Sequence, residues 1–346
     1  MRYGASFVIL FSLLRYSSPG SGQSPTEHSV HFADLFDFGP RLTLEENPEV
    51  VNAAPYISFD RNDGLLVWDG MEQQVRIYAR DGKLRHHFGR RGQGPGEFRR
   101  LAGAERLLSG NIVTADANGR LTIWDSIGSH VLRDVSLNLF RITSISVLGN
   151  DSLAVTTVPS VTDPQNLAVP ILHIVDLASG QVVTDGLAPP MTLSTVGAWT
   201  TVNVGGSLRT TRALYVTLPI VDTLYASEGD RDNFRRIAIS NEITRKNGPT
   251  PNAHAERRRF EDWLRSVTFI GDVFGDEVHG FAIQLFGAGQ TANRGIIYVA
   301  AGFTDIYAVP DAPAVLAFDS RTGNFLFKDP DWLEPNRLRF AKVRRR

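Results

Sequence analysis

The 346-residue chain contains no cysteine. It therefore cannot form a disulfide, a thiolate zinc site or a cysteine nucleophile, and it has no cysteine to which a bacterial lipid anchor could be attached. An excess of charge of one sign is also missing, because 36 Lys and Arg face 37 Asp and Glu. Without a basic field to attract phosphates, we expect no nucleic-acid partner.

Recognisable catalytic signatures are absent as well. The sequence has no His-Glu-x-x-His, no Gly-x-Ser-x-Gly and no pair of carboxylates at a known fixed spacing. This favours a binding protein over an enzyme, although an active site assembled from single residues on many repeats would leave no such signature.

A long apolar run is missing too, and the apolar stretch at 5–14 covers only about ten residues, roughly half of what crosses a bilayer. Arg2 precedes this stretch and small, turn-forming residues follow it at 17–22. This order is typical of a secretory signal. We therefore predict a signal peptide over 1–22, a single domain over 30–346, and a secreted or periplasmic protein with no membrane span after cleavage.

The remaining sequence alternates apolar and polar residues between Asp-Gly and Ser-Gly turns, which is the pattern of β-strands. One segment, 63–69, aligns with 109–116, so that Gly64 and Gly110 lie 46 residues apart. A second strand follows in each copy and ends at a turn glycine, Gly82 or Gly128, again 46 residues apart. A period in the forties with about four strands per unit is typical of propeller blades.

Weaker copies follow along the chain. They pair segments 149–155 with 172–176, 214–216 with 223–225, and 295–300 with 315–319. Five units are therefore visible. The strand-like segment 30–36 is expected to join the C-terminal sequence and close the ring, which removes free sheet edges.

The segment 88–98, Phe-Gly-Arg-Arg-Gly-Gln-Gly-Pro-Gly-Glu-Phe, resembles the connector between blades in NHL-type bacterial six-bladed propellers. Asp69 and Arg76 match the aspartate and arginine of the NHL strand pair, and Asp116 and Arg120 match them less well in spacing. The resemblance implies an all-β propeller with six blades of four antiparallel strands. It is specific over residues 57–128 and faint beyond them.

This connector has two interpretations. A dinucleotide loop would need a third glycine and a helix where Pro95 and Glu97 stand, and no P-loop lysine follows. We therefore interpret the segment as a rigid structural turn between blades. Its defining residues are Gly89, Gly92, Gly94, Pro95, Gly96 and Phe98.

Candidate metal ligands are few, and we expect no cofactor, with an axial divalent cation as the alternative. Segment 60–64 resembles the start of a calcium loop, but Met71 stands where the glutamate is required. His86 and His87 are consecutive on a strand and would point to opposite faces. Glu277 and His279 would share one strand face, which makes them a weak metal or acid–base pair.

Aspartates recur at predicted strand ends, namely Asp69, Asp116, Asp125, Asp176 and Asp319. Such acids usually accept backbone N–H groups in turns. As an alternative, Asp69, Arg76, Asp116 and Arg120 would project toward one face or the axis and bind a ligand there, with the acids forming a cation-friendly channel mouth.

A helix is predicted only over 253–267, as an insertion that packs Phe260, Trp263 and Leu264 onto the ring. Taken together, the sequence favours an exported binding or scaffolding propeller for a protein, peptide or glycan ligand. The alternative is a metal-dependent propeller hydrolase or lyase of the lactonase or amidating-lyase type, because amidating lyases contain similar blades.

Overall fold

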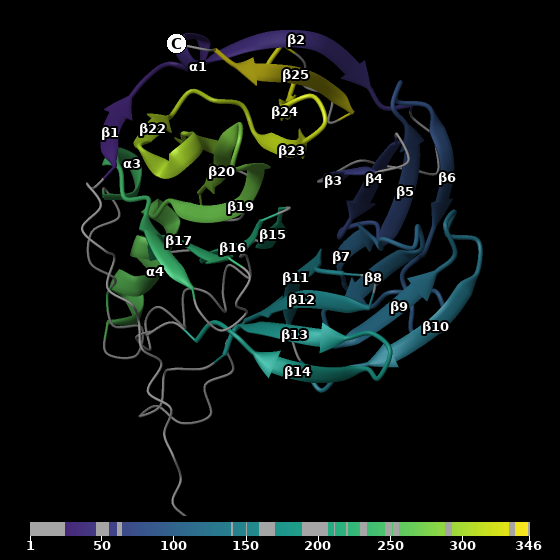
Figure 1. The fold of residues 1–346 in the computed structure, drawn as a ribbon. Coiled ribbons are helices and arrows are strands. Elements are labelled where there is room, and N and C mark those ends of the chain that lie inside the picture. The colour runs from purple at the N-terminus through teal and green to yellow at the C-terminus, as the bar shows by residue number, and fades with distance from the viewer. Residues whose placement is uncertain are drawn as a thin grey trace, which may run out of the picture.

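The computed structural model shows six β-sheets arranged as blades around a central axis, a six-bladed β-propeller, as predicted (Figure 1). The residues that it describes are 25–45, 55–60, 64–139, 141–149, 151–158, 170–188, 207–210, 212–218, 221–228, 234–245, 251, 256–287, 293–331 and 336–344. The predicted signal peptide at 1–22 lies outside the described residues.

Each blade contains four antiparallel strands arranged outward from the axis. The first blade contains β3 (Pro55–Asp60), β4 (Gly64–Asp69), β5 (Gln74–Ala79) and β6 (Leu84–Phe88). The second contains β7 (Leu101–Arg106), β8 (Ile112–Asp116), β9 (Arg120–Trp124) and β10 (Val131–Ser136). The third contains β11 (Ile142–Val147), β12 (Ser152–Thr157), β13 (Leu172–Asp176) and β14 (Gln181–Asp185).

The other three blades complete the ring. The fourth contains β15 (Ser207–Arg209), β16 (Ala213–Leu218), β17 (Val221–Glu228) and β18 (Arg235–Ala238). The fifth contains β19 (Phe269–Asp276), β20 (Gly280–Phe286), β21 (Asn293–Val299) and β22 (Asp305–Val309), with β1 (Thr26–Ser29) added outside β22. The sixth contains β23 (Val315–Asp319), β24 (Asn324–Lys328), β25 (Arg337–Val343) and, as its outermost strand, β2 (Phe36–Thr43).

The N-terminal sequence closes the ring, but of the predicted segment 30–36 only Phe36 belongs to the strand that does so. Strand β2 pairs antiparallel with β25, whereas Phe32–Leu35 forms the short helix α1. Phe32, Leu35 and Phe36 are all buried. Their spacing of three and four residues places them on one side of a helical turn, which favours a turn over a strand here.

Two of the sequence repeats need comment. Asp69 and Asp116 end β4 and β8, the second strands of neighbouring blades, as the 46-residue period indicates. The unit built from 295–300 and 315–319 is wrong, because these segments are β21 of the fifth blade and β23 of the sixth. Many of the hairpins share the same alternation and a turn glycine, so the pattern alone does not distinguish one strand pair from the next.

The core lies between the blades. Between the first and second blades, for example, Leu66, Val75, Ile77 and Phe98 are buried with Ala104 of β7. Each large side chain buried in this way contributes about 1.5–3 kcal/mol. The ring is therefore stabilised by packing between the faces of neighbouring sheets, and residues of the loops and the axis contribute less to this core.

The predicted inserted helix is present as α4 (Arg257–Ser266), between the fourth and fifth blades; α3 (Glu242–Arg245) and the 3-10 turn η1 (Ala301–Phe303) are shorter. Phe260 and Trp263 are buried in a cluster with Phe269 and Phe286 of the fifth blade, and Leu264 packs against it. Among the described residues, no helix is long and apolar enough to cross a membrane.

Candidate functional site

The glycine-rich connector folds onto its own glutamate. The Glu97 carboxylate accepts hydrogen bonds from the N–H groups of Gln93 (3.0 Å) and Gly94 (2.9 Å) and from Arg90 Nε (2.8 Å). These bonds hold the pKa of Glu97 below its usual value. The donors that a phosphate would need are thus already occupied by the carboxylate of Glu97.

Packing fixes the rest of the connector. Phe98 is 1% exposed and lies in the core between the first two blades. Gly89 and Gly96 have φ of 81° and 73°, the left-handed region that glycine alone enters freely. Gly92 donates to the Phe98 carbonyl at 3.0 Å, whereas Pro95 is exposed. Sequence reasoning missed Glu97, the residue that organises this turn.

The predicted ring of strand-end acids does not form one site. Asp69 and Asp116 lie in turns between second and third strands, whereas the turns of Asp125 and Asp176 follow third strands and that of Asp319 follows a first strand. Antiparallel strands place these two kinds of turn at opposite ends of the propeller. The five acids therefore do not gather on one face.

These aspartates also have partners in their turns. Asp69 accepts from the N–H of Met71 at 2.7 Å, and Asp116 accepts from the N–H of Asn118 at 2.9 Å as well as from that of Arg99 in the connector at 2.7 Å. Backbone N–H groups likewise donate to Asp125, Asp176 and Asp319. The two arginines are engaged too: Arg76 is fully buried, and Arg120 donates to the carbonyl of Gly94 at 3.2 Å.

Glu277 and His279 lie in the turn between β19 and β20, not on a strand as expected. His279 Nδ1 lies 2.9 Å from Asp276 Oδ1, whereas the Glu277 carboxylate accepts from the Tyr215 hydroxyl at 3.1 Å in the fourth blade. The two side chains are therefore held by different partners. Across the described residues, no three His, Cys, Asp or Glu side chains gather as metal ligands do.

The other metal candidates are equally dispersed. The calcium-like segment begins at Asp60, whose carboxylate forms a buried ion pair of 2.6 Å with Arg106 of the second blade. Residues 61–63 of that segment lie outside the described residues. His86 and His87 lie on β6, the outermost strand of the first blade, far from the axis.

The structure places a different set of side chains at the axis, and we call Tyr56, Trp68, Arg100 and Asp272 the axial site. Tyr56 on β3 lies directly across from Trp68 on β4, and their rings stack with centroids 4.0 Å apart and planes 8° apart. Tyr56 is nevertheless 39% exposed. An aromatic side chain that is both rigidly stacked and exposed is a common feature of recognition surfaces.

Asp272 lies on β19, the innermost strand of the fifth blade. The first and fifth blades are not neighbours, since β23 lies between β19 and β3 (Figure 1). The Asp272 charge nevertheless raises the pKa of Tyr56, second only to burial, while the charge of Arg100 opposes it. The charges of Asp272 and Arg100 thus act on the Tyr56 hydroxyl in opposite senses.

A β-bulge presents Asp272. The register of β19 against β20 shifts between Ile270 and Val273, so that Gly271 and Asp272 oppose a single residue. The bulge is anchored by Thr217 Oγ1, which donates to the Gly271 carbonyl at 2.6 Å. A Cβ at Gly271 would lie 2.6 Å from the Phe286 ring, so this position requires glycine. Bulges often redirect a side chain next to a functional site.

Two carboxyl groups on innermost strands are desolvated. Burial raises the pKa of Asp272 to about 6 and that of Glu105, on β7, to about 7. Neither has a hydrogen-bond or ion-pair partner among the described residues, although both keep some contact with solvent. Perturbed carboxyls without partners mark candidate functional positions.

None of these axial residues was singled out from the sequence. The available signal was a charged residue within an otherwise apolar innermost strand, as in Phe-Ile-Gly-Asp-Val-Phe and Leu-Ala-Gly-Ala-Glu. Without knowing which strand is innermost, such a residue cannot be told from one on a solvated face.

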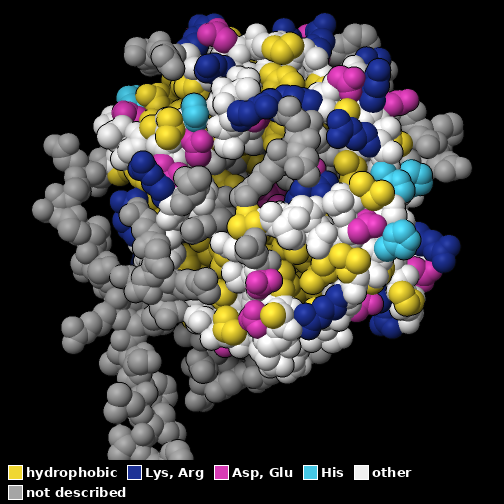
Figure 2. Space-filling view, turned by 45° about the vertical axis from the view of Figure 1, so that its right-hand side comes forward, with side chains coloured by type: hydrophobic (Ala, Val, Ile, Leu, Met, Phe, Trp, Pro, Cys, Tyr) yellow, Lys and Arg dark blue, Asp and Glu magenta, His cyan; other side chains and the backbone are white. Residues whose placement is uncertain are grey.

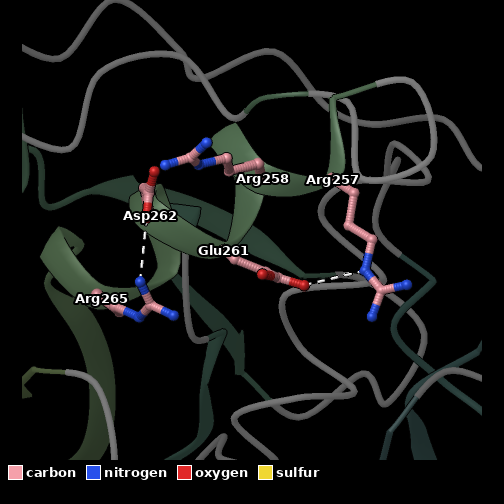
Figure 3. Close-up of a pocket in the computed structure, with 5 residues that line it drawn as sticks. All are labelled: Arg257, Arg258, Glu261, Asp262 and Arg265. Carbon is pink, nitrogen blue, oxygen red and sulfur yellow. Dashed lines mark hydrogen bonds and ion pairs between the residues drawn. The ribbon is translucent and has the colours of Figure 1, made fainter.

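A pocket on the solvent side of α4 is lined by Arg257, Arg258, Glu261, Asp262 and Arg265 (Figure 3). Glu261 pairs with Arg257 at 3.0 Å and Asp262 with Arg265 at 3.1 Å, within the helix itself. Such exposed pairs contribute about 0.3–0.5 kcal/mol each and are typical of a solvated helix face. Figure 2 likewise shows basic and acidic side chains interspersed over the face it presents.

The fold has counterparts among solved structures. A candidate exported protein from Bacteroides fragilis NCTC 9343 matches with a TM-score of 0.67 and 12% identity, over 93% of this chain and 99% of that one. A member of the DUF4221 family from Bacteroides vulgatus ATCC 8482 matches with a TM-score of 0.62 and 10% identity, over 90% and 98%. At these identities the likeness shows the six-bladed fold alone.

A more distant match extends the likeness beyond bacteria. The β-propeller domain of Cps50 (Swd1) from the fungus Myceliophthora thermophila has a TM-score of 0.50 and 10% identity, over 88% of this chain and all of that one. No family model matches the chain, and no curated protein matches it. The NHL resemblance is therefore supported as far as the six-bladed fold, and the NHL family itself is not.

Proposed function

We propose that the protein is exported and acts as a non-catalytic binding or scaffolding propeller, whose protein, peptide or glycan ligand binds at the axial site. One observation carries the proposal: Tyr56 stacks on Trp68 at a centroid distance of 4.0 Å and is nevertheless 39% exposed, and the charge of Asp272, which has no partner among the described residues, acts on it. An aromatic face beside a polar group without a partner is the usual composition of a binding site.

Export is supported by the signal-like sequence at 1–22 and by the exported character ascribed to the Bacteroides fragilis protein. N-terminal sequencing of the full chain expressed in a Gram-negative host tests it. We expect a mature protein that begins near Gly22 in the periplasm or medium. Uncleaved protein in the cytoplasm would contradict export.

Binding is tested on glycan and peptide arrays with the wild-type chain and a Tyr56→Ala variant. We expect the variant to lose the strongest signals by about tenfold or more, since a central aromatic contact is often worth 1.4 kcal/mol or more. Tyr307→Ala is the matched control, because Tyr307 also stacks on a neighbour, His28, but at the outer edge of the fifth blade.

Equal loss of signal in both variants, or none in either, would contradict binding at the axial site. The proposal requires no metal. Stoichiometric zinc or calcium in the purified protein would instead favour the hydrolase or lyase alternative.

A further inference from the structure

We propose that the connector between the first two blades, residues 89–100, is a second binding surface and recognises the negatively charged groups of an acidic polysaccharide. The connector leads from β6, the outermost strand of the first blade, to β7, the innermost strand of the second. Only its last residue, Arg100, is shared with the axial site. The inference therefore goes beyond the proposed function and concerns a different surface.

The connector is strongly basic. It contains four arginines and one glutamate, which gives a formal charge of +3 in a chain whose formal charge is −1. The arginines are Arg90, Arg91, Arg99 and Arg100, and all four are exposed. Glu97 is already neutralised within the connector, because its carboxylate forms an ion pair of 2.7 Å with Arg90.

The other three arginines keep their charge uncompensated among the described residues. The guanidinium groups of Arg91 and Arg100 form no hydrogen bond or ion pair there, and that of Arg99 donates only to the neutral side chain of Gln93. Such exposed cations are available to an anionic ligand without first breaking an ion pair within the protein.

The fold brings the two ends of the connector together. Arg91 and Phe98 form a parallel bridge, in which the Phe98 N–H donates to the Arg90 carbonyl at 2.8 Å and the Gly92 N–H donates to the Phe98 carbonyl at 3.0 Å. Arg91 and Arg99 are therefore attached at neighbouring points of the backbone, although eight residues separate them in the sequence. Because the buried Phe98 ring anchors this backbone, little order has to be created when a ligand binds.

The charges directly beneath the connector cancel one another. Arg120 of β9 donates to the Gly94 carbonyl at 3.2 Å. The Asp116 carboxylate accepts from the backbone N–H groups of Arg99 at 2.7 Å and Arg100 at 3.3 Å. One cation and one anion thus support the connector from below, and its own positive charge remains.

The surroundings favour a glycan over a protein or a nucleic acid. Apart from Pro95, no apolar side chain of the connector is exposed, and its one aromatic ring, Phe98, is buried. A protein partner usually needs an apolar interface core, and a single-stranded nucleic acid usually stacks its bases on exposed aromatic rings. Guanidinium groups instead form paired hydrogen bonds with oxyanions. An acidic polysaccharide repeats such groups along its length and can contact several arginines at once.

The test compares a heparin decasaccharide, which carries carboxylate and sulfate groups, with maltodecaose, which has the same number of sugars and no charge. Binding to the mature full-length protein is measured by calorimetry. We expect heparin to bind at least about tenfold more tightly, and its affinity to fall by about tenfold between 50 and 200 mM salt. Equal binding of the two sugars, or no binding of heparin, would overturn the proposal.

Charge removal locates the surface. The double variant Arg91→Gln, Arg99→Gln should weaken heparin binding by about tenfold, because two exposed charge contacts are lost. The matched control is Arg257→Gln, Arg265→Gln, which removes the same charge from exposed arginines that pair within α4, and it should change the affinity less than twofold. Equal weakening in both double variants would mean that only the net charge matters, and would refute the proposed surface.

A single substitution guards against a structural explanation. Arg91→Gln removes a side chain with no bonded partner among the described residues, so it should leave the melting temperature unchanged and still weaken heparin by about threefold. Unchanged heparin affinity in this variant would count against the surface. A polyglutamate peptide or a single-stranded oligonucleotide of equal charge that binds more tightly than heparin, with the same dependence on Arg91, would overturn the assignment to a polysaccharide.

The two proposals fail separately. Array signals from uncharged ligands that depend on Tyr56 should persist in the Arg91→Gln, Arg99→Gln variant. Absence of heparin binding therefore leaves the proposed function standing, whereas loss of the proposed function leaves a heparin affinity that depends on Arg91 and Arg99 unaffected.

Discussion

Replacing Glu105 by glutamine should stabilise this protein at alkaline pH and have little effect at acid pH. Glu105 lies near the end of β7, and burial raises its pKa from the ordinary 4.5 to about 7. The folded protein therefore binds this proton more tightly than the unfolded chain does. The contribution to stability is fully present below pH 4.5 and is lost as the pH rises through 7.

The size of the effect follows from the same numbers. A pKa of about 7 in place of 4.5 corresponds to about 3 kcal/mol at pH 8, and to under 1 kcal/mol at pH 5. Because the side chain retains some contact with water, we expect about 2–3 kcal/mol at pH 8. In a chain of this length, each kcal/mol of change in the free energy of unfolding shifts the melting temperature by about 1–2 °C. Glu105→Gln should thus raise the midpoint by about 3–5 °C at pH 8 and by about 1 °C at pH 5.

The assay is thermal unfolding followed by circular dichroism at both pH values. Glu72→Gln is the control, because Glu72 is exposed in the turn after β4 and loses the same charge. It should shift neither midpoint. An equal shift of Glu105→Gln at the two pH values, or a lower midpoint at pH 8, would refute the desolvation argument.

Further predictions concern the contacts between neighbouring blades and the inserted helix α4. Gly96→Ala should lower the melting temperature more than Gly110→Ala. Both glycines have positive φ, but only at Gly96 would a Cβ meet a tryptophan ring, at 2.9 Å. Equal losses would mean that backbone strain, and not this contact, causes the destabilisation. Arg106→Gln should cost about 3–5 kcal/mol in denaturant unfolding, because it leaves the Asp60 carboxylate buried without its cation, and adding Asp60→Asn should restore much of the loss. Trp263 should resist acrylamide quenching, because it lies on the buried face of α4; ready quenching would contradict a docked helix.

The part of the fold that the sequence predicts is the part encoded locally. The period of 46 residues can be recognised because Gly64 opens, and Gly110 shortly precedes, a strand that ends at an aspartate, Asp69 or Asp116. The later blades carry the same alternation with turns of other lengths, so the repeat could be assigned to the wrong strand pair. The axial site depends on ring closure: Tyr56 and Asp272 lie 216 residues apart, and nothing near either one indicates the other.

The same distinction explains the candidate acids. An aspartate at a strand end, such as Asp116, is visible in the sequence because turns require it, and its partners include a backbone N–H group of that turn. Asp272 can be recognised only in the three-dimensional structure, where it lies in a β-bulge that interrupts the register of β19. Local patterns therefore indicate side chains with a structural role more readily than those without partners.

The pairing of β2 with β25 imposes an order of events on synthesis. Asp37 and Arg344, joined by a hydrogen bond across this pair, lie 307 residues apart. Strand β2 is made among the first and cannot find its partner until nearly the whole chain is complete. Contacts of such long range form slowly and leave apolar side chains such as Phe36 unprotected meanwhile. The proposed export would benefit from this delay, because the ring cannot close before its last strand is made.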